Sequence, residues 1–551
     1  MKRKLLIIAL SLTMVFSLMP GLAAADTDTT QTAGSGQIVI LGTTDVHCSV
    51  TQSATSMGYS GVAAYKKAME SEYGEANVTL IDSGDATQGG IIGTVSKGAY
   101  LEEIMNKTGY DVLAPGNHDF DYNFANMLKN ASNSTGTYVC CNLTSTITGK
   151  RIFPRYRMIK YGDVKVAYVG ITTPETFTTS TPSYFKNSKG KFIYSFAEDS
   201  TGAKLYSCVQ RAVNAARSNG ADYVVAVSHL GTSTSTARWS AVSVIKNTTG
   251  IDVIFDGHSH ETYCDELTNK DGKSVPRLQA GYGLSAMGKA VIDTKTGTVT
   301  ASLVKDYTIS DPEVASYIDS INATLSDSLK QVVCTSKYDL TIVDPKTGER
   351  IVRTGETNLG DLIADANRVV MKADVGICNG GGIRASIKAG NVTLGDVMTV
   401  MPYANKICVI RVTGRQLRDM LEYSASRYPA ENGGFLQVSG VTFKIDSSVA
   451  SSVVVDDNSM FVKVAGDRRV SNVRVNGKII YLNKTYTVAG SNYTLLNSGD
   501  GYAMFGAKPV IVTPAKLFDT TVLKKYISGS LGGVVGKGYE DPYGSGRIII
   551  N

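Results

Sequence analysis

Residues 116–121 read Gly116-Asn117-His118-Asp119-Phe120-Asp121, and they follow a short apolar run at 111–113. Asn, His and Asp side chains bind metal ions and move protons in enzymes. Placed just past the end of a strand, they lie at the carboxyl edge of a sheet, where open α/β sheets bind their ligands. This stretch therefore predicts an α/β fold with a polar site at one edge of its sheet.

All five histidines of the chain share this position after an apolar run. The other strings that combine His or Asp at such a position are Asp45-Val46-His47, Asp82-Ser83-Gly84-Asp85, Ser228-His229 and Asp256-Gly257-His258-Ser259-His260. Residues two apart in an extended segment point the same way, as in the pairs Asp45/His47 and His258/His260. A lone histidine is more often structural than a ligand, but here no histidine lies outside the pattern. We therefore predict one shared metal site.

Apolar runs alternate with helical patterns in the first half of the chain, which indicates βα units and a largely parallel sheet. The runs are 38–41, 78–81, 111–113, 164–171, 223–227 and 251–255, and the helical segments include 62–73, 101–107 and 203–218. An amphipathic helix is predicted from Asp311 to Val333, as a linker within 311–335. Beyond it the pattern restarts, with Asn358 as a candidate N-cap for a helix and a strand at 375–378.

Length and charge restrict the class of protein. A chain of 551 residues is too long for one core, so two domains or more are expected. The formal charge is +6, and Lys2, Arg3 and Lys4 supply three of these positives, which leaves about +3 without them. That bias is too small to favour a nucleic-acid polymer or a membrane surface as the partner. Nothing in the sequence selects an oligomeric state.

The N-terminus has the pattern of a secretory signal peptide over residues 1–25. A basic start precedes an apolar run to Met19, and Ala23-Ala24-Ala25 provides small residues for cleavage. Residues 26–36, rich in Thr, Ser, Gly and Asp, are expected to be a flexible lead-in. No later segment is long and apolar enough for a stable membrane span. We expect an exported protein, whether secreted, on the cell surface or periplasmic.

Eight cysteines are spread over the chain without a CxxC pair. An even number permits disulfides in an exported protein, but mostly buried thiols are the preferred interpretation. Imidazole and carboxylate ligands without thiolate pairs suit Zn, Mn, Co or Fe. The candidate ligands are too many for one ion, and two divalent ions about 3.5–4 Å apart can share a bridging carboxylate.

The order DxH, GD, GNHDFD, SH and DGHSH resembles that of the calcineurin-like metallophosphoesterases. Further motifs in the second half are Asn358-Leu359-Gly360, Asn379-Gly380-Gly381-Gly382-Ile383-Arg384, Met401-Pro402-Tyr403-Ala404-Asn405, the run 435–440, and Ser498-Gly499-Asp500-Gly501. With them the chain resembles the 5′-nucleotidase family over about 37–545. The resemblance implies a four-layer α/β/β/α metallophosphoesterase domain at 37–310 and a smaller α/β C-terminal substrate-binding domain at 336–551.

The resemblance also implies roles for the metal candidates. One ion would be held by Asp45, His47, Asp85 and His260, and the other by Asp85, Asn117, His229 and His258, with Asp85 bridging. His118 would face the substrate, and Asp121 would orient its imidazole and favour the protonated form. The ions would lower the pKa of a bound water, so that hydroxide attacks phosphorus in line without a phosphoenzyme.

Residues of the second half match the substrate-binding positions of the family. They are the phosphate-binding arginines Arg350, Arg353 and Arg384, the base-stacking Tyr403 and Tyr493, Asp500 for the ribose hydroxyls, Asn405 for the base edge, and Asn379 of the glycine loop. Arginine suits phosphate because its planar fork makes two bonds and stays charged. Aromatic stacking holds a base with about 1–3 kcal/mol and tolerates different bases.

The expected activity is hydrolysis of nucleoside 5′-phosphates to nucleoside and phosphate. A 2′,3′-cyclic-nucleotide 2′-phosphodiesterase with 3′-nucleotidase activity, or a UDP-sugar hydrolase, would use the same metals. The run 435–440 and the arginine set favour the first. A protein phosphatase is disfavoured by the second domain with its aromatic pair, and a catalytically inactive binding module by the complete set of ligands.

Overall fold

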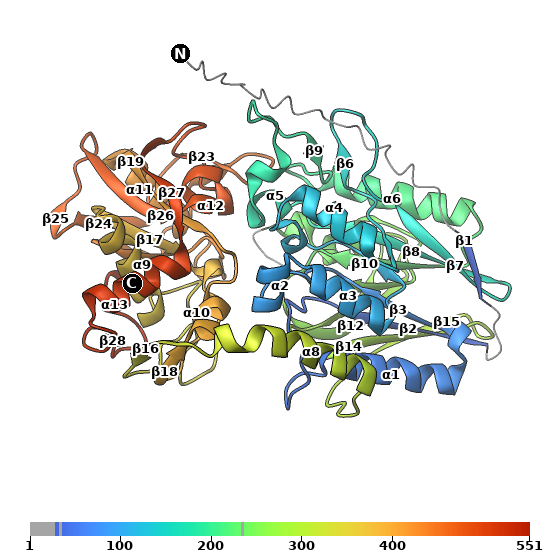
Figure 1. Cartoon of the computed structure of the whole chain (residues 1–551). Coiled ribbons are helices and arrows are strands. Elements are labelled where there is room, and N and C mark those ends of the chain that lie inside the picture. Colours follow the sequence, from blue (N-terminus) through green and yellow to red (C-terminus); the bar gives the residue numbers. More distant parts are fainter. Residues whose placement is uncertain (1–27, 32–35, 233–235) are drawn as a thin grey trace, which may run out of the picture.

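The computed structural model describes residues 28–31, 36–232 and 236–551. The predicted signal peptide over 1–25 lies outside these residues. Within them, no helix has both the length and the apolar character that crossing a bilayer requires. Figure 1 shows two domains side by side, with helix α8 (Pro312–Leu329) running from one toward the other.

Two stacked sheets form the centre of the N-terminal domain. The strands of the first, in spatial order, are β15 (Thr298–Val304), β14 (Met287–Asp293), β2 (Gln37–Thr43), β3 (Val78–Asp82), β4 (Val112–Leu113) and β5 (Thr137–Tyr138). Those of the second are β1 (Asp28–Gln31), β7 (Tyr156–Tyr161), β8 (Val164–Thr172), β10 (Tyr223–His229), β11 (Val253–Asp256), β13 (Ser274–Ala280) and β12 (Thr262–Thr268). The pairs β2–β3–β4–β5 and β8–β10–β11–β13 are parallel.

Helices cover the outer face of each sheet. The first sheet carries α1 (Gly58–Tyr73), α3 (Ala99–Thr108), α4 (Phe124–Asn133) and α8, and the second carries α6 (Ala203–Ser218) and α7 (Ala241–Asn247). Three apolar cores separate the four layers, one between the sheets and one under each helical layer. The predicted four-layer α/β/β/α arrangement is confirmed, and each predicted strand and helix of this half has its counterpart.

At the edges of this domain, one segment has a different structure from the expected one, and one predicted helix ends earlier than expected. Asp28–Gln31, in the expected flexible lead-in, forms strand β1 and pairs in parallel with β7, whose edge it covers. The linker helix predicted over 311–335 ends at Leu329, because Val332–Ser336 forms strand β16. This segment contains β-branched Val332, Val333 and Thr335, which favour a strand, and it pairs with β18 (Gly390–Thr393) and β28 (Val534–Val535).

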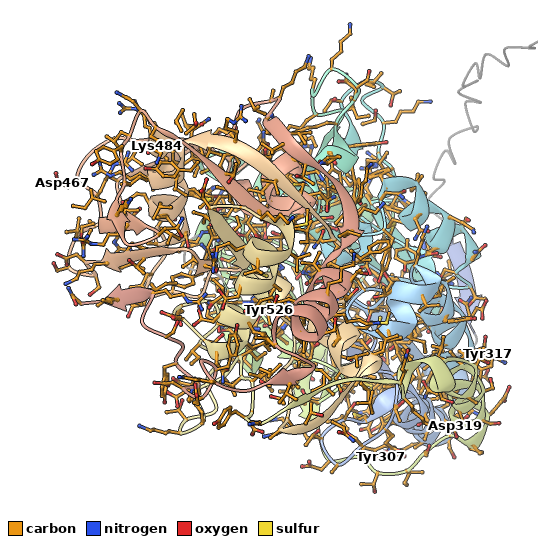
Figure 2. The ribbon with its side chains drawn as sticks, turned by 60° about the vertical axis from the view of Figure 1, so that its left-hand side comes forward. Tyr307, Tyr317, Asp319, Asp467, Lys484 and Tyr526 are labelled. Atoms are coloured by element: carbon orange, nitrogen blue, oxygen red, sulfur yellow. The ribbon has the colours of Figure 1, made fainter. Side chains whose placement is uncertain are left out.

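The C-terminal domain is also α/β, and its central sheet has the order β20 (Leu436–Ser439), β17 (Val375–Asn379), β26 (Thr485–Ser491), β19 (Lys406–Thr413) and β27 (Val510–Phe518). Its helices include α9 (Asn358–Met371), α10 (Leu394–Val400), α11 (Gly414–Ser424), α12 (Asn492–Asn497) and α13 (Asp519–Ser530). A smaller sheet has the order β25 (Lys478–Ile479), β24 (Val470–Val475), β21 (Val441–Ile445) and β29 (Ile548–Ile550), and β22 (Val453–Val455) pairs with β23 (Phe461–Val464). In Figure 2, Asp467 and Lys484 mark the outer edge of this domain, opposite Tyr317.

The predicted cap of α9 is displaced by one residue. The side chain of Thr357, not Asn358, accepts from the Gly360 amide. Asn358 is instead buried, where its side chain accepts from Thr341 N and donates to Asp339 O and Tyr539 O. Asn358 therefore fixes the loops around the start of α9, a role that the local sequence pattern does not distinguish from capping.

A glycine pair lets the two sheets of the N-terminal domain approach each other. Gly42 on β2 and Gly288 on β14 are directly opposite each other. A Cβ on Gly42 would lie 2.4 Å from Cδ1 of Phe255, and one on Gly288 would lie 3.0 Å from Cε1 of the same ring. The pair thus forms the hollow for Phe255, which precedes the Asp256-Gly257-His258 turn. The packing of Phe255 against the two glycines therefore fixes the position of the turn that follows β11.

Gly42→Ala is therefore expected to lower the free energy of unfolding by about 1–3 kcal/mol, the usual cost of overpacking a core. Trp239, the single tryptophan, is buried in this domain and reports its unfolding in urea by fluorescence. The double variant Gly42→Ala/Phe255→Leu should lose less stability than the sum of the losses of the two single variants. Gly529→Ala, where a Cβ meets nothing within 4 Å, is the control. Equal midpoints for Gly42→Ala and the wild type would contradict this account.

Candidate metal and substrate site

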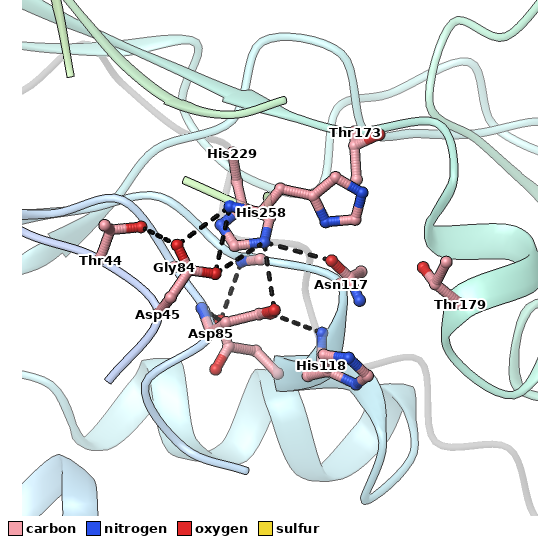
Figure 3. Close-up of polar contacts among 12 residues, drawn as sticks. Thr44, Asp45, Gly84, Asp85, Asn117, His118, Thr173, Thr179, His229 and His258 are labelled. Atoms are coloured by element: carbon pink, nitrogen blue, oxygen red, sulfur yellow. Dashed lines mark hydrogen bonds and ion pairs between the residues drawn. The ribbon is translucent and has the colours of Figure 1, made fainter. Parts of the chain in front are cut away.

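The carboxyl ends of five strands from both sheets deliver the predicted residues to one place. β2 leads to Asp45 and His47, β3 to Asp85, β4 to Asn117 and His118, β10 ends at His229, and β11 leads to His258 and His260. Figure 3 shows Asp45, Asp85, Asn117, His229 and His258 converging around one volume, with His118 beside it. The pattern read from the sequence therefore corresponds to one cluster in space.

One candidate ligand group consists of Asp45, His47 and His260, whose ligand atoms lie within 4.8 Å of one another. Nε2 of His47 lies 3.2 Å from Nε2 of His260, which lies 3.5 Å from Oδ1 of Asp45. Nδ1 of His47 donates to the carbonyl oxygen of Gln88 at 2.8 Å, so Nε2 is the nitrogen left for an ion.

A second group consists of Asp45, Asp85 and His229. Oδ2 of Asp85 lies 3.2 Å from Nε2 of His229 and 3.6 Å from Nε2 of His47, between histidines of the two expected ion sites. Asn117 Oδ1 lies 3.2 Å from Nε2 of His229. Asp45 is the residue that belongs to both groups, whereas Asp85 belongs to the second and lies within 3.6 Å of a histidine of the first.

The donor set fits divalent cations. Asp45 and Asp85 are 0% and 1% exposed, and within the described residues the groups at ion-pair distance from them are histidines, with no Lys or Arg among them. Burial, together with the charge of Asp85, raises the pKa of Asp45 to about 6. Two buried carboxylates without a fixed cation are costly unless ions neutralise them.

The backbone around the cluster is held in an uncommon conformation. Asp45, His47, Asp85, His258 and His260 all have positive φ, between 45° and 80°. Residues other than glycine rarely adopt this region, and such strain gathers at functional sites. The tight turns aim successive side chains into one small volume.

Glycines in the motifs are required for space. A Cβ on Gly116 would lie 2.2 Å from Oδ1 of Asp85, and one on Gly257 would lie 2.9 Å from Oδ2 of Asp45. Either side chain would displace a candidate ligand. The glycines that precede Asn117 and His258 are therefore part of the site.

Other acids of the same motifs support the loops and do not face the cluster. Asp119 accepts from the amides of Asp85 and Gly116 at 3.0 and 2.8 Å. Asp256 accepts from Ser228 Oγ and from the amide of Leu230, at 2.7 and 2.9 Å. These acids hold the ligand loops in position.

His118 lies beside the cluster in contact with Asp121. Nδ1 of His118 is 2.7 Å from Oδ2 of Asp121, whose Oδ1 accepts from Ser180 Oγ at 2.8 Å. Burial alone would lower the pKa of His118, but the charges of Asp121 and Asp85 and the hydrogen bond to Asp121 outweigh it and raise the pKa. The imidazole thus keeps its proton more readily than a free histidine, with Nε2 left for another partner.

His258 has a partner that the sequence did not predict. Its backbone N donates to Asp45, whereas Nε2 of its ring lies 2.8 Å from Oε2 of Glu175. Burial would raise the pKa of Glu175, but the bond from His258 and the charges of His258 and Arg427 lower it to about 2. Glu175 therefore carries a negative charge beside His258.

A cavity of about 590 Å³ lies between the domains and joins the cluster to the predicted substrate residues. Its lining includes the metal-side residues Asp85, Asn117, His118, Asp121, His258 and His260 and all eight substrate-side candidates, Arg350, Arg353, Asn379, Arg384, Tyr403, Asn405, Tyr493 and Asp500. This volume is typical of small-molecule sites. Asp45, His47 and His229 lie deeper, at 2% exposure or less.

The three arginines differ in the partners that their guanidinium groups already have. Arg350 forms a two-pronged ion pair with Glu431, with Nε to Oε1 at 2.9 Å. Burial, with the neighbouring charges of Arg350 and Arg384, lowers the pKa of Arg353 to about 9, and its buried Nε has no partner within the described residues. An anion in the cavity would satisfy Arg353 and Arg384, whereas Arg350 is already neutralised.

Both aromatic candidates line the cavity and have different neighbours. The ring of Tyr403 is 5.7 Å from that of His118, centroid to centroid. The hydroxyl of Tyr493 donates to the carbonyl oxygen of Thr178 at 2.6 Å, across the domain boundary, and lies 3.0 Å from Oδ1 of Asp500. Asn379 donates to Oδ2 of Asp500 at 2.8 Å. Asn379 is thus a support for Asp500.

Sequence reasoning missed Glu175, Arg427, Glu431 and Tyr282. The ring of Tyr282 lies 5.3 and 4.7 Å from those of His47 and His260. Glu175 follows β8 by three residues, so the rule of strand ends could have found it. No local signal marks the other three, because long-range packing alone brings Arg427 and Glu431 to the cavity and Tyr282 to the histidines.

Residues 38–262 match the calcineurin-like phosphoesterase family, and residues 333–507 match the 5′-nucleotidase C-terminal domain. The chain belongs to the 5′-nucleotidase family. In agreement with that assignment, it is a metal-dependent phosphoester hydrolase with a metallophosphoesterase domain followed by a 5′-nucleotidase C-terminal domain.

Relatives of this 5′-nucleotidase family member span both domains. The 5′-nucleotidase of Vibrio vulnificus (strain CMCP6) is 26% identical, with 96% of each chain covered. The trifunctional nucleotide phosphoesterase protein YfkN of Bacillus subtilis (strain 168) is 28% identical over 77% of this chain and 30% of YfkN. The crystal structure of a 5′-nucleotidase precursor from Thermus thermophilus has the same fold, with a TM-score of 0.77 at 24% identity and coverage of 93% and 99%.

Removal of divalent ions is expected to destabilise the protein. Burial alone would lower the pKa of His229, but the charges of Asp85 and Asp45 raise it to about 10, so one protonated imidazole is then the main counter-charge for two carboxylates. Adding Mn²⁺, Co²⁺ or Zn²⁺ at about 100 times Kd to chelator-treated protein should stabilise it by about 2.7 kcal/mol. The shift in melting temperature measures this gain. Asp85→Asn should abolish most of it, whereas Asp252→Asn, whose carboxylate pairs with Arg217 far from the cluster, should not. An equal metal response in both variants would contradict the assignment of the site.

Proposed function

We propose that the protein is an exported 5′-nucleotidase that uses two divalent ions to hydrolyse nucleoside 5′-phosphates to nucleoside and phosphate. One observation carries the proposal: a single cavity is lined by the candidate ligands on one side and by arginines, two tyrosines and Asp500 on the other. Those groups match a phosphate, a base and a ribose in turn. The names of the relatives, with 5′-nucleotidases among them, support the same conclusion.

When bound, divalent ions supply Lewis-acid activation of water and of the phosphoryl oxygens. The seven candidate ligands would hold them, with Asp85 placed between the two groups. Arg353 and Arg384 bind the anionic oxygens and set the phosphate against the cluster. Tyr403 and Tyr493 hold the base, and Asp500 accepts from the ribose hydroxyls. Binding energy from the nucleoside thereby orients a distant phosphate.

His118 acts on the substrate from beside the cluster. Asp121 holds the proton on Nδ1, and its charge and hydrogen bond raise the pKa of the ring. Nε2 then donates to a phosphoryl oxygen as charge develops, or to the departing alkoxide. No Ser, Cys or Asp nucleophile is needed, so hydrolysis proceeds without a phosphoenzyme.

Phosphate release from a substrate panel tests the function. The panel contains AMP, UMP, ADP, UDP-glucose, 2′,3′-cyclic AMP and 3′-AMP, assayed with chelated enzyme and after reloading with Mn²⁺, Co²⁺ or Zn²⁺. The 5′-monophosphates should have the highest kcat/KM, and chelated enzyme should be inactive. Preference for 2′,3′-cyclic AMP and 3′-AMP, or for UDP-glucose, would replace the proposal with the corresponding alternative on the same site.

His118→Ala should lower kcat by about 10²–10⁴-fold, the usual contribution of a positioned acid, and should retain the metal content of the wild type. Elemental analysis and single-turnover kinetics measure the two effects. Asp121→Asn, which keeps the shape of the side chain but weakens the hold on the proton, should have an intermediate loss. Loss of metal from His118→Ala would show that His118 is a ligand.

A further inference from the structure

Each buried histidine of the cluster has one ring nitrogen fixed by an acceptor outside it. Nδ1 of His47 lies 2.8 Å from the carbonyl oxygen of Gln88, and Nδ1 of His229 lies 2.7 Å from that of Ser83. A nitrogen that donates its proton outward leaves the other nitrogen with a lone pair for an ion. For these two histidines the nitrogen left is Nε2, and in both cases the acceptor is backbone.

His258 has the opposite arrangement. Its Nε2 lies 2.8 Å from Oε2 of Glu175, so Nδ1 is the nitrogen left for an ion. The ring centroid of His258 is 5.2 Å from that of His229, and its backbone N donates to Asp45. The acceptor that contacts His258 is therefore a side-chain carboxylate, not a backbone carbonyl.

Glu175 is held rigidly for this task. It is 5% exposed, and its own amide donates to Thr173 Oγ1 at 3.2 Å. Its carbonyl oxygen accepts from the amides of Thr178 and Thr179 at 2.8 and 2.9 Å, and from both of their hydroxyls. Its second carboxylate oxygen, Oε1, lies 3.8 Å from Nη1 of Arg427 in the C-terminal domain.

We propose that Glu175 is a positioning residue for the metal centre: it keeps the proton of His258 on Nε2 and thereby presents Nδ1 to an ion. The proposal rests on the metal site of the proposed function but not on the identity of the substrate. The proton stays on His258 throughout, so no group is transferred. Because the ring can rotate about two bonds, loss of Glu175 would release both the tautomer and the orientation.

The test compares Glu175→Ala with Glu175→Gln. Alanine removes the acceptor, whereas the amide oxygen of glutamine can still accept from Nε2. Zn²⁺ affinity is measured by competition with a chromogenic chelator, with stoichiometry from elemental analysis. Glu175→Ala should bind one of its ions about 10–100-fold more weakly, the usual effect of losing such a partner, and Glu175→Gln should restore most of the affinity. Glu198→Ala is the control, since that carboxylate accepts from Ser195 Oγ and the amide of Phe196 and from no histidine.

A spectroscopic readout separates positioning from general loss of structure. The chain has five histidines, so ¹⁵N-histidine labelling gives few signals, and the spectrum of His258→Gln assigns that of His258. In the metal-free wild type, two-bond ¹⁵N–¹H correlations should show the proton on Nε2, and Glu175→Ala should show a mixture of tautomers. A proton on Nδ1 in the wild type overturns the proposal even where Glu175→Ala fails to fold. Wild-type Zn²⁺ affinity in Glu175→Ala overturns it as well. Neither measurement uses a substrate, so a negative substrate panel leaves this result interpretable.

Discussion

Two carboxylates are buried in one small cluster, and the N-terminal domain must both position them and compensate their charge. Asp45 and Asp85 are almost fully buried, and among the described residues only histidines lie at ion-pair distance from them. Like charges in such a place are tolerated when cations neutralise them. The stacked sheets provide the strand ends, the left-handed residues turn side chains inward, and Gly116 and Gly257 leave the space. Asp119 and Asp256 brace the loops from behind.

The C-terminal domain presents the opposite excess of charge to the same cavity. Burial and the charges of Arg350 and Arg384 lower the pKa of Arg353, and its Nε lacks a partner within the described chain. The acids on one side of the cavity repel one another, and so do the arginines on the other side. A divalent cation beside the acids and a phosphate between cation and arginines would balance both. Glu431 neutralises the charge of Arg350, so two of the three arginines remain for an anion.

The sequence predicts the strand ends and their ligands because each is a local pattern: an apolar run followed by His, Asp or Asn. It predicts the four layers through a resemblance carried by those same motifs. Contacts between distant segments leave no local pattern. Arg427 and Glu431 reach the cavity through the packing of the C-terminal domain, and Asn358 looks like a cap although Thr357 is one. The predicted end of α8 lies beyond the observed one because the 3.6-residue apolar period continues past Leu329 into β16.

The segment around α5 (Thr176–Thr179) joins these two sets of contacts. Within five residues, Glu175 holds His258 and lies near Arg427, and the carbonyl oxygen of Thr178 accepts from the hydroxyl of Tyr493. Tyr493 also contacts Asp500, which itself is held by Asn379. A phenylalanine at 493 would keep the ring face but lose the contacts of the hydroxyl with Thr178 O, Asp500 Oδ1 and Asp500 N. The tyrosine therefore adds a link, from the side of the cavity proposed for the nucleoside to the segment that orients His258. Movement of one domain relative to the other would therefore change the contacts of Tyr493 and Arg427 with the same segment whose Glu175 contacts His258.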